Sequence, residues 1–422
     1  MNLHRAPAHH YHDLVLRLHR SKIPYEDMAR DYGPLERQHH TECVPRDYQS
    51  EALDAWRSAG RRGLIVLPTG AGKSFVAELC LADANRSTLI VAPTLDLVGQ
   101  WYDRLRRAFG DPVGILGGGC HQVESITVST YDSAWMHIER YGAKFGLVVF
   151  DEVHHLPSQT YSQAALGAIA PFRLGLSATP ERSDGDDARL DRLVGPIVYR
   201  REIGELAGEF LAEYRTEVLT VALSHEDRQA YDEARLLFRS FVESRGIRMG
   251  GRGGWNHFLR EAARSKEGRA AHRAWMASRR LLQGAPAKLR LVEELLRRHR
   301  DGRVILFTND NATVYDISRR LLLPAITHQT DLKERRALLD AFASGDLPVL
   351  VTSKVLNEGV DIPSADVAIV LSGTGTVREH VQRLGRILRR QAGKQAVLYE
   401  LVVEDSAEER TSARRRDHEA YR

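Results

Sequence analysis

The sequence predicts an α/β protein with two parallel-sheet domains in tandem and a helical insertion. Short apolar runs alternate with helical patterns in the first half of the chain, and the same alternation begins again at Ala287. Between the two halves, residues 225–290 interrupt the alternation with a mostly helical and basic segment. Short apolar strands separated by helices are typical of parallel sheets that are covered on both faces.

Composition and charge limit the class of protein. The chain has 422 residues, of which 43% are hydrophobic and 27% charged, as expected of a globular protein with two domains and an insertion. A net charge of +4 permits nucleic-acid binding without requiring it. Three widely spaced cysteines argue against a disulfide framework or a structural zinc site. We find neither a signal sequence nor a membrane-spanning run, so we expect a cytoplasmic protein.

Residues 1–43 form an N-terminal extension that is rich in histidine. Its seven histidines have no carboxylate or cysteine partners at the spacing of metal ligands, so we do not expect a metal site. Leu14, Val15, Leu16 and Leu18 predict a short helix that packs on the first domain.

The first domain is expected over residues 44–205, and a candidate adenine site lies near its start. Arg46 and Gln49 stand about twenty residues before a glycine-rich loop and lead into an apolar helical pattern. A glutamine amide can both donate to and accept from the edge of an adenine ring. Together with the loop, this predicts adenine recognition by Gln49, with Arg46 at the same nucleotide site.

The glycine-rich loop at residues 67–74 follows an apolar run and precedes an amphipathic one, which indicates strand, loop and helix. The backbone N–H groups of such a loop can surround a polyphosphate, and the N-terminus of the helix adds favourable partial charge. We expect Lys73 to reach the β and γ phosphates and Ser74 to bind Mg²⁺. The loop residues assigned to ATP are Thr69, Gly70, Ala71, Gly72, Lys73 and Ser74. The alternative is a turn that binds nothing.

Two acidic residues end one of the following strands. Apolar runs at 88–92, 125–128 and 147–150 predict three further strands, and ligands of such sheets bind beyond the carboxyl ends of the strands. Asp151 and Glu152 follow the third run directly. A carboxylate there is costly unless it is solvated, paired or near a cation. We therefore assign Asp151 to Mg²⁺ and Glu152 to the attacking water. A helix cap by Asp151 is the alternative.

A further strand is expected at residues 172–176, and Ser177, Ala178 and Thr179 follow it before a proline. The hydroxyl groups among these small residues could hydrogen-bond to residues 151–154 and so couple nucleotide hydrolysis to a movement of the protein. An ordinary turn is the alternative interpretation.

After a linker at residues 206–224, a helical insertion is expected over residues 225–286. Residues 225–290 contain 15 Lys and Arg against 7 Asp and Glu, so their arginines are candidates for phosphate contacts. Trp255, Phe258 and Trp275 could stack on bases, but a small core within the insertion is the preferred interpretation.

The second domain is expected over residues 287–403, followed by a charged tail at 404–422 that frays or forms an exposed helix. Apolar runs at 304–307, 349–351, 367–370 and 397–399 predict its sheet. Gln382, Arg386 and Arg389 have the spacing of one helix face. Both arginines could stabilise the negative charge that develops on a transferred phosphoryl group. The alternative is that they form a solvated basic face of a surface helix.

The set of motifs resembles the superfamily 2 helicases over about 350 of the 422 residues. Residues 70–74 are similar to their motif I, residues 151–154 to motif II, residues 177–179 to motif III and residues 382–389 to motif VI. In that superfamily the first position of motif I need not be glycine, which accounts for Leu67. Residues 151–155 and 174–184 resemble in particular the XPB-type DNA repair helicases of archaea and bacteria.

The resemblance implies two RecA-like domains with ATP and Mg²⁺ between them. It assigns Lys73, Asp151, Glu152, Arg386 and Arg389 to catalysis and adds Gly359, Asp361 and Gln382 to the nucleotide site. It implies that one strand of nucleic acid is contacted by Pro93, Thr94, Thr130, Thr308 and Thr352, and that Arg182 and Asp184 help to open duplex DNA. The insertion looks like the helical thumb of XPB-type proteins.

The chain departs from the family pattern in two places. XPB-type proteins carry Arg-Glu-Asp after motif III, whereas this chain has Ser183 between Arg182 and Asp184. The family also usually has a damage-recognition domain before the helicase core, and 43 residues are too few to form one. We therefore do not transfer damage recognition to this chain.

The resemblance implies an ATP-dependent DNA helicase or translocase that moves 3′ to 5′ on single-stranded or forked DNA. We expect a monomer, with a separate nuclease or repair protein as a plausible partner. An RNA helicase or remodelling ATPase is one alternative. A DNA-binding scaffold without catalysis is another, although the complete set of ATPase residues argues against it.

Overall fold

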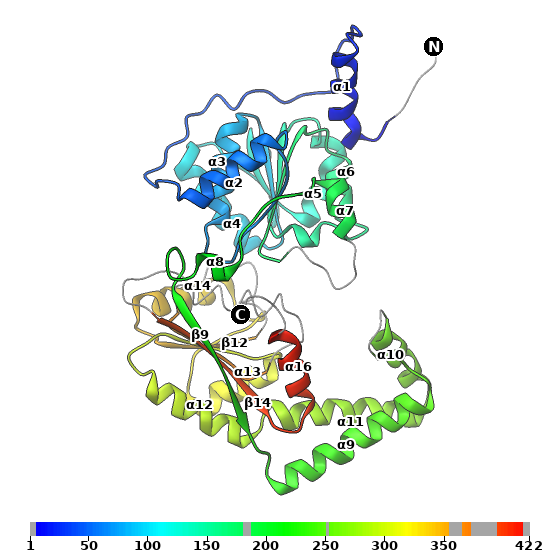
Figure 1. Cartoon of the computed structure of the whole chain (residues 1–422), viewed down its shortest axis with the longest axis vertical. Helices are drawn as coiled ribbons and strands as arrows, with labels where there is room; N and C mark the ends of the chain where they lie inside the picture. The colour runs from blue at the N-terminus through cyan, green and yellow to red at the C-terminus, as the bar shows by residue number, and fades with distance from the viewer. Residues whose placement is uncertain (1–5, 180–186, 250–252, 354–364, 373–394, 417–422) are drawn as a thin grey trace. The chain divides into compact units, whose positions relative to one another are not determined.

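The structure is a computed structural model that describes residues 6–179, 187–249, 253–353, 365–372 and 395–416 (Figure 1). The chain divides into two compact units, one that extends to Leu211 and one that begins at Ala212.

The first unit is built on an eight-stranded sheet with the order β4-β3-β5-β2-β6-β7-β1-β8. Its strands are β1 (Arg62–Val66), β2 (Thr88–Ala92), β3 (Gly114–Gly117), β4 (Cys120–Gln122), β5 (Ile126–Thr130), β6 (Leu147–Phe150), β7 (Phe172–Ser177) and β8 (Ile197–Arg200). All neighbouring strands are parallel except β3 and β4. The predicted α/β fold is confirmed, and β3, β4 and β8 are strands that the sequence patterns did not predict.

Helices cover both faces of this sheet, with α2, α3 and α4 on one side of the strands in Figure 1 and α5, α6 and α7 on the other. The helices are α2 (Asp47–Ser58), α3 (Lys73–Ala84), α4 (Leu95–Phe109), α5 (Tyr131–Tyr141), η2 (Val153–His155), α6 (Ser162–Leu166), α7 (Asp187–Leu193) and α8 (Ile203–Leu206). Strands β2, β5 and β6 are buried along their whole length, because both of their faces meet helices.

The N-terminal extension contains a 3₁₀ turn, η1 (Ala8–His10), and the helix α1 (Tyr11–Arg20). A helix was expected here, and its contact with the first domain is made mainly by η1, where His9 is buried and near α6. No residue of α1 is buried, and Leu14 is 49% exposed. The packing of this helix on the domain is therefore looser than the apolar pattern predicts.

The second unit contains a six-stranded parallel sheet with the order β11-β12-β10-β13-β14-β9. The strands are β9 (Glu213–Val221), β10 (Val304–Phe307), β11 (Ala325–Ile326), β12 (Val349–Thr352), β13 (Val367–Val370) and β14 (Gln395–Val403). The helices α12 (Pro286–Arg298), α13 (Asn311–Leu321) and α14 (Leu332–Ser344) accompany this sheet. The second predicted parallel sheet is thereby confirmed.

The linker predicted at residues 206–224 needs a correction, because it contains β9. This strand pairs in parallel with β14 along nine residues, from Glu213 beside Gln395 to Val221 beside Val403. Its side chains are mostly half-buried, as at the edge of a sheet, and their alternating pattern lacks the continuous apolar run of the central strands. For that reason the sequence pattern did not reveal it.

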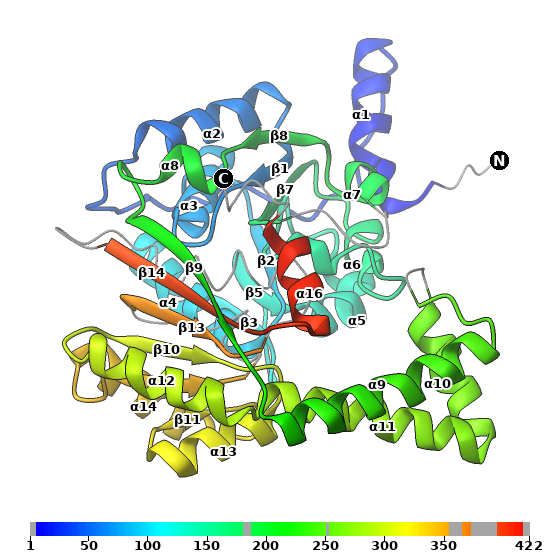
Figure 2. The ribbon, with the colours of Figure 1, turned by 60° about the horizontal axis from the view of Figure 1, so that its bottom comes forward.

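Three helices follow β9, namely α9 (His225–Ser244), α10 (Gly254–Arg264) and α11 (Lys266–Gln283), and we call them the thumb. Helices α9 and α11 lie side by side, with α10 at their far end (Figure 1, Figure 2). A small core of Phe238, Phe241, Ile247, Phe258, Ala262 and Ala271 joins the three helices. Phe258 is fully buried, and Trp255 and Trp275 pack against this core.

The charged tail also needs a correction. We expected it to fray or to form an exposed helix, but α16 (Ala407–Arg416) packs beside β14. Ser406 and Ser412 are buried, and the Ser412 hydroxyl donates to Glu400 Oε2 at 2.9 Å. In the part of the chain that the structure describes, every helix is too short or too polar to traverse a lipid bilayer.

Candidate active site

The phosphate loop connects β1 to α3 and depends on two glycines in left-handed conformations. Gly70 has φ 90° and Gly72 has φ 81°. A Cβ on Gly72 would lie 2.6 Å from Gln49 Nε2, so a larger residue would displace the Gln49 amide as well as strain the backbone. The ammonium group of Lys73 donates to Leu67 O at 3.2 Å and is thereby folded over the loop. The first N–H groups of α3 have no acceptor within the helix and are suited to an anion.

Helix α2 holds this loop through two side chains. Tyr48 Oη donates to Ala71 O at 2.8 Å, and Gln49 Nε2 donates to the same oxygen at 3.2 Å. Gln49 Oε1 also accepts from the backbone N–H of Arg46 at 3.0 Å, which caps α2. The Arg46 guanidinium lies over the Phe210 ring. Adenine binding by Gln49 and Arg46 stays a prediction, and Gln49 already supports the loop.

Asp151 lies at the carboxyl end of β6 and is buried, with 6% of its surface exposed. Its Oδ2 accepts from Trp101 Nε1 at 2.8 Å, and its Oδ1 accepts from the backbone N–H of Glu152 at 3.0 Å. Tyr131 Oη donates to the main-chain oxygen of Asp151 at 3.0 Å. Burial raises the pKa of Asp151, while the Trp101 hydrogen bond and the charge of Lys73 act in the opposite direction. The phosphate-loop lysine and this carboxylate are therefore electrostatic neighbours.

Glu152 is next to this carboxylate and has a left-handed backbone, with φ 46°. A glutamate in this region is uncommon, and such conformations are concentrated at functional sites. Glu152 Oε2 is buried and has no hydrogen-bond partner among the described residues, although His154 Nδ1 lies 3.4 Å away. A buried carboxylate oxygen that still has capacity to accept a hydrogen bond is suited to orient a water molecule.

The Ser177 segment shows both features that the sequence allowed, a contact with the segment of Asp151 to His154 and an ordinary Ser/Thr turn. Ser177 Oγ lies 3.4 Å from His154 Nδ1 and accepts from the backbone N–H of Thr179 at 3.1 Å. The ends of β6 and β7 are thus joined by side chains as well as by the sheet.

The residues present fit a nucleotide and its metal ion. Among the described residues, Thr69 Oγ1 in the loop is buried without a hydrogen-bond partner, as is Glu152 Oε2. Ser74 stands in the first turn of α3, where its hydroxyl can join the Asp151 carboxylate as a hard oxygen ligand. Each oxygen of an ionised carboxylate retains acceptor capacity beyond the single bond that it accepts here.

The predicted nucleic-acid contacts of the first unit lie where two helices begin. Pro93 and Thr94 follow β2, and Thr94 Oγ1 caps α4 by accepting from Leu97 N at 3.3 Å. Thr130 ends β5, and its Oγ1 caps α5 by accepting from Ser133 N at 3.1 Å. Because β2 and β5 are neighbours in the sheet, the structure brings these positions to one edge. Contact with nucleic acid at this edge stays a prediction.

The corresponding threonines of the second unit are inside the fold. Thr308 and Thr352 are fully buried. The Thr308 hydroxyl donates to Asp310 O, and the Thr352 hydroxyl donates to Ile326 O, each at 3.0 Å. Both hydroxyls therefore stabilise strand ends in this structure, and their role in nucleic-acid binding stays untested.

Seven predicted site residues lie outside the described residues, so the structure does not test them. They are Arg182, Asp184, Gly359, Asp361, Gln382, Arg386 and Arg389.

Trp101 and Tyr131 contact Asp151, although the sequence pattern does not identify either as a site residue. Each is an aromatic residue at a buried position of its helix and reads as core in the sequence. Only the hydrogen bonds from their polar atoms to Asp151 distinguish them from ordinary core residues.

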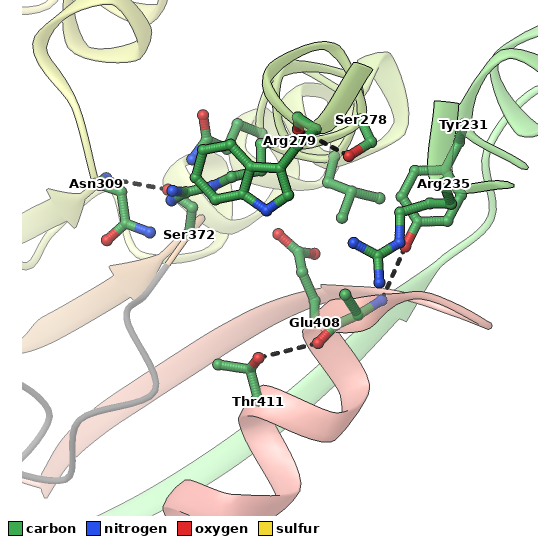
Figure 3. Close-up of a pocket in the computed structure, with 12 residues that line it drawn as sticks. Tyr231, Arg235, Ser278, Arg279, Asn309, Ser372, Glu408 and Thr411 are labelled. Carbon is green, nitrogen blue, oxygen red and sulfur yellow. Dashed lines mark hydrogen bonds between the residues drawn. The ribbon is translucent and has the colours of Figure 1, made fainter. Parts of the chain in front are cut away.

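The second unit contains a cavity of about 330 Å³ where the base of the thumb meets the ends of β10 and β13 and the start of α16 (Figure 3). Its lining includes Arg235 and Arg279 from the thumb and Asn309 after β10. Arg235 Nε and Asn309 Oδ1 are buried without a hydrogen-bond partner in the described residues. Burial lowers the pKa of Arg235. Glu408 also lines the cavity, and its carboxylate is paired with Lys288.

Comparisons with known proteins agree with this geometry. Residues 42–182 match the family model described as type III restriction enzyme, res subunit, and residues 287–391 match the helicase conserved C-terminal domain. The chain is 44% identical over 372 residues to a protein of Sulfurisphaera tokodaii named DNA 3′-5′ translocase XPB2, covering 88% of this chain and 84% of the relative.

More distant relatives carry related names. A protein of Mycobacterium tuberculosis named DNA 3′-5′ helicase XPB is 30% identical over 384 residues, which are 88% of this chain and 62% of that protein. Among solved structures, the helicase domain of Pyrococcus furiosus Hef matches with a TM-score of 0.56 at 20% identity, covering 87% of this chain and 97% of that chain. At this identity the Hef match supports the fold.

Proposed function

Because the chain belongs to the XPB-type superfamily 2 helicases, we propose that it is an ATP-dependent DNA translocase or helicase that moves 3′ to 5′. The names of its relatives give this direction and the substrate. One observation on the chain itself carries the proposal. Two adjacent carboxylates, the buried Asp151 and the partly buried Glu152, directly follow the strand β6, and Asp151 lies within electrostatic reach of the phosphate-loop Lys73.

The residues of the first unit have separate tasks in this proposal. The loop that ends at Gly72 and the first turn of α3 bind the phosphates, and Lys73 exchanges its bond to Leu67 O for a phosphate oxygen. Ser74 and Asp151 would hold Mg²⁺, which when bound neutralises phosphate charge. Glu152 Oε2, which has no hydrogen-bond partner among the described residues and lies 3.4 Å from His154 Nδ1, is the acceptor that orients and deprotonates the attacking water.

Three further parts of the proposal rest on the sequence alone. Arg386 and Arg389 supply positive charge to the transition state, a contribution of about 10³ to 10⁵ in rate in other phosphoryl-transfer enzymes. Gly359, Asp361 and Gln382 complete the nucleotide site. A separate nuclease or repair protein as a partner stays a prediction.

The experiment measures ATP hydrolysis with and without forked DNA. We expect DNA to stimulate hydrolysis, and Lys73→Ala and Glu152→Gln to abolish it. The matched controls are Lys144→Ala and Glu139→Gln, which change exposed residues of the same unit and should retain wild-type rates. DNA-stimulated hydrolysis that survives both site variants would refute this assignment of the site.

A strand-displacement assay on forks with either a 3′ or a 5′ single-stranded arm tests the direction. Unwinding that needs the 3′ arm supports the proposal, whereas unwinding that needs the 5′ arm contradicts it. RNA of equal length is included, because contacts with the phosphate backbone do not by themselves distinguish the two sugars. Stronger stimulation by RNA than by DNA would favour an RNA helicase instead.

A further inference from the structure

Asp151 is held by side chains from two different helices. Trp101 of α4 donates its indole N–H to Oδ2 at 2.8 Å, and Tyr131 of α5 donates its hydroxyl to the main-chain oxygen at 3.0 Å. Trp101 is 3% exposed and Tyr131 is 2% exposed. An indole has a single donor, and a buried side chain has little room to change rotamer. The position of each ring therefore follows the position of its helix.

The same two helices begin at the proposed nucleic-acid edge. Thr94 is the N-cap of α4, and Thr130 is the N-cap of α5. Trp101 lies seven residues after Thr94, about two helical turns along α4. Tyr131 directly follows Thr130. A phosphate bound at either N-terminus thus acts on a helix that carries a donor to Asp151.

The packing around these helices favours movement of each as a whole. Trp101 shares the buried face of α4 with Val98 and Leu105, at helical spacing. Tyr131 lies in the main core of the unit, and its ring is 6.3 Å from that of Phe150 in β6. Close-packed interiors transmit small shifts, because they have few voids into which side chains can relax.

We propose that Trp101 is a positioning residue, which holds the Asp151 carboxylate in the orientation that binds the metal ion. Trp101 and Tyr131 together link the nucleic-acid edge to this carboxylate. The inference rests on the proposed function. In this arrangement, nucleic acid bound at Thr94 and Thr130 fixes the positions of α4 and α5. The hydrogen bonds from Trp101 and Tyr131 then transmit a shift of either helix to Asp151. DNA stimulation of the ATPase then depends on both hydrogen bonds.

The first test is Trp101→Phe, which keeps an aromatic ring and removes the N–H donor. The readout is binding of a fluorescent ADP analogue to the full-length protein as Mg²⁺ is titrated. We expect the Mg²⁺ concentration at half-saturation to rise about tenfold, since loss of a side chain that orients a metal ligand typically costs 10 to 100-fold in affinity. Binding in EDTA should be unchanged. The matched control is Trp135→Phe, at an exposed tryptophan of α5.

The second test is Tyr131→Phe, which removes one hydroxyl and keeps the ring in the core. With Mg²⁺ at a concentration that saturates each variant, we expect the ratio of DNA-stimulated to basal ATP hydrolysis to fall severalfold in both variants, whereas DNA affinity is retained. A simple loss of stability would lower basal and stimulated rates together. If Trp101→Phe does not fold, Tyr131→Phe alone decides the linkage.

Wild-type Mg²⁺ dependence in Trp101→Phe together with wild-type stimulation in both variants would overturn the inference. Failure of the proposed function looks different, because the unmodified protein would then show no stimulation by DNA. In that case the Mg²⁺ titration of nucleotide binding still tests whether Trp101 positions Asp151.

Discussion

The ammonium group of Lys288 lies 2.7 Å from a carboxylate oxygen of Glu408, and the Lys288 side chain is fully buried. Lys288 also donates to Leu371 O at 2.7 Å. These contacts join α12 to the start of α16 and to the chain that follows β13. Glu408 in turn accepts from the backbone N–H of Val403 at 3.0 Å.

We predict that Lys288→Met, which leaves Glu408 without its cation, lowers the free energy of unfolding by about 3 to 5 kcal/mol. The double variant with Glu408→Leu should recover most of the loss, since an apolar pair can replace a buried ion pair. Urea unfolding measures both. Lys266→Met, at an exposed position of the thumb, is the control. A loss below about 1 kcal/mol in the single variant would show that this pair does not anchor the tail.

The thumb should be destabilised by Phe258→Ala. Phe258 is fully buried between the Phe238, Phe241 and Trp255 rings, and truncation of a buried phenylalanine costs about 3 to 5 kcal/mol. Because this core is separate from the cores of both sheets, we expect faster amide hydrogen exchange in α9–α11 and little change elsewhere. The neighbouring Leu259→Ala, at a side chain that is 37% exposed, is the control. Accelerated exchange throughout both sheets would contradict this prediction.

Two substitutions at Gln49 should separate its structural role from its predicted contact with adenine. Gln49→Glu keeps the acceptor for the N–H of Arg46 but loses the donor to Ala71 O, whereas Gln49→Ala loses both. We expect only the alanine variant to lose the cap of α2, at a cost of about 1 kcal/mol in unfolding free energy. Both variants should lose preference for ATP over GTP in competition binding. Retained ATP preference in both would exclude the adenine contact.

Stability should decrease in mildly acidic solution. Burial lowers the pKa of His9, His12 and His299 below the ordinary value of 6.5. For His9, the charges of His10, Arg173 and Arg192 act in the same direction. As the pH falls below 6.5, the unfolded chain binds protons that the folded state does not, so the free energy of unfolding falls. We expect a lower melting temperature at pH 5.5 than at pH 7.5.

His9→Leu should reduce the slope of melting temperature against pH, whereas His19→Leu, at an exposed position of α1, should leave it unchanged. Equal slopes in the wild-type protein and in His9→Leu would show that His9 does not contribute to the pH dependence.

The central strands could be predicted because they are continuous apolar runs buried on both faces. Residues 147–150 are an example, and all four are buried in β6. Edge strands could not be predicted in this way, because β4 is exposed along its length and β9 is mostly half-buried. The charged tail was misjudged for a related reason. α16 has little apolar surface, and it is held by polar contacts with distant residues such as Lys288.

The candidate site, like the fold, could be predicted from the sequence only in part. The spacing of Lys73, Asp151 and Glu152 from apolar strands was sufficient to predict that they meet at one sheet edge. The hydrogen bonds of Trp101 and Tyr131 were not predictable, because nothing in a single sequence tells a buried aromatic ring that only packs from one that also donates to a carboxylate. Gln49 was assigned to the ligand alone, although its amide also braces the loop.

The pairing of β9 with β14 has a consequence for the order in which the protein is made. β9 leaves the ribosome before the thumb, but the strand that it pairs with, β14, begins only at Gln395. Throughout synthesis of residues 222–394, β9 has no neighbour in its own sheet. The thumb helices, which have their own apolar cluster, can pack during this interval. The second sheet therefore closes only after β14 has been made, and a nascent chain that stops before β14 leaves β9 as an unpaired strand available to other chains.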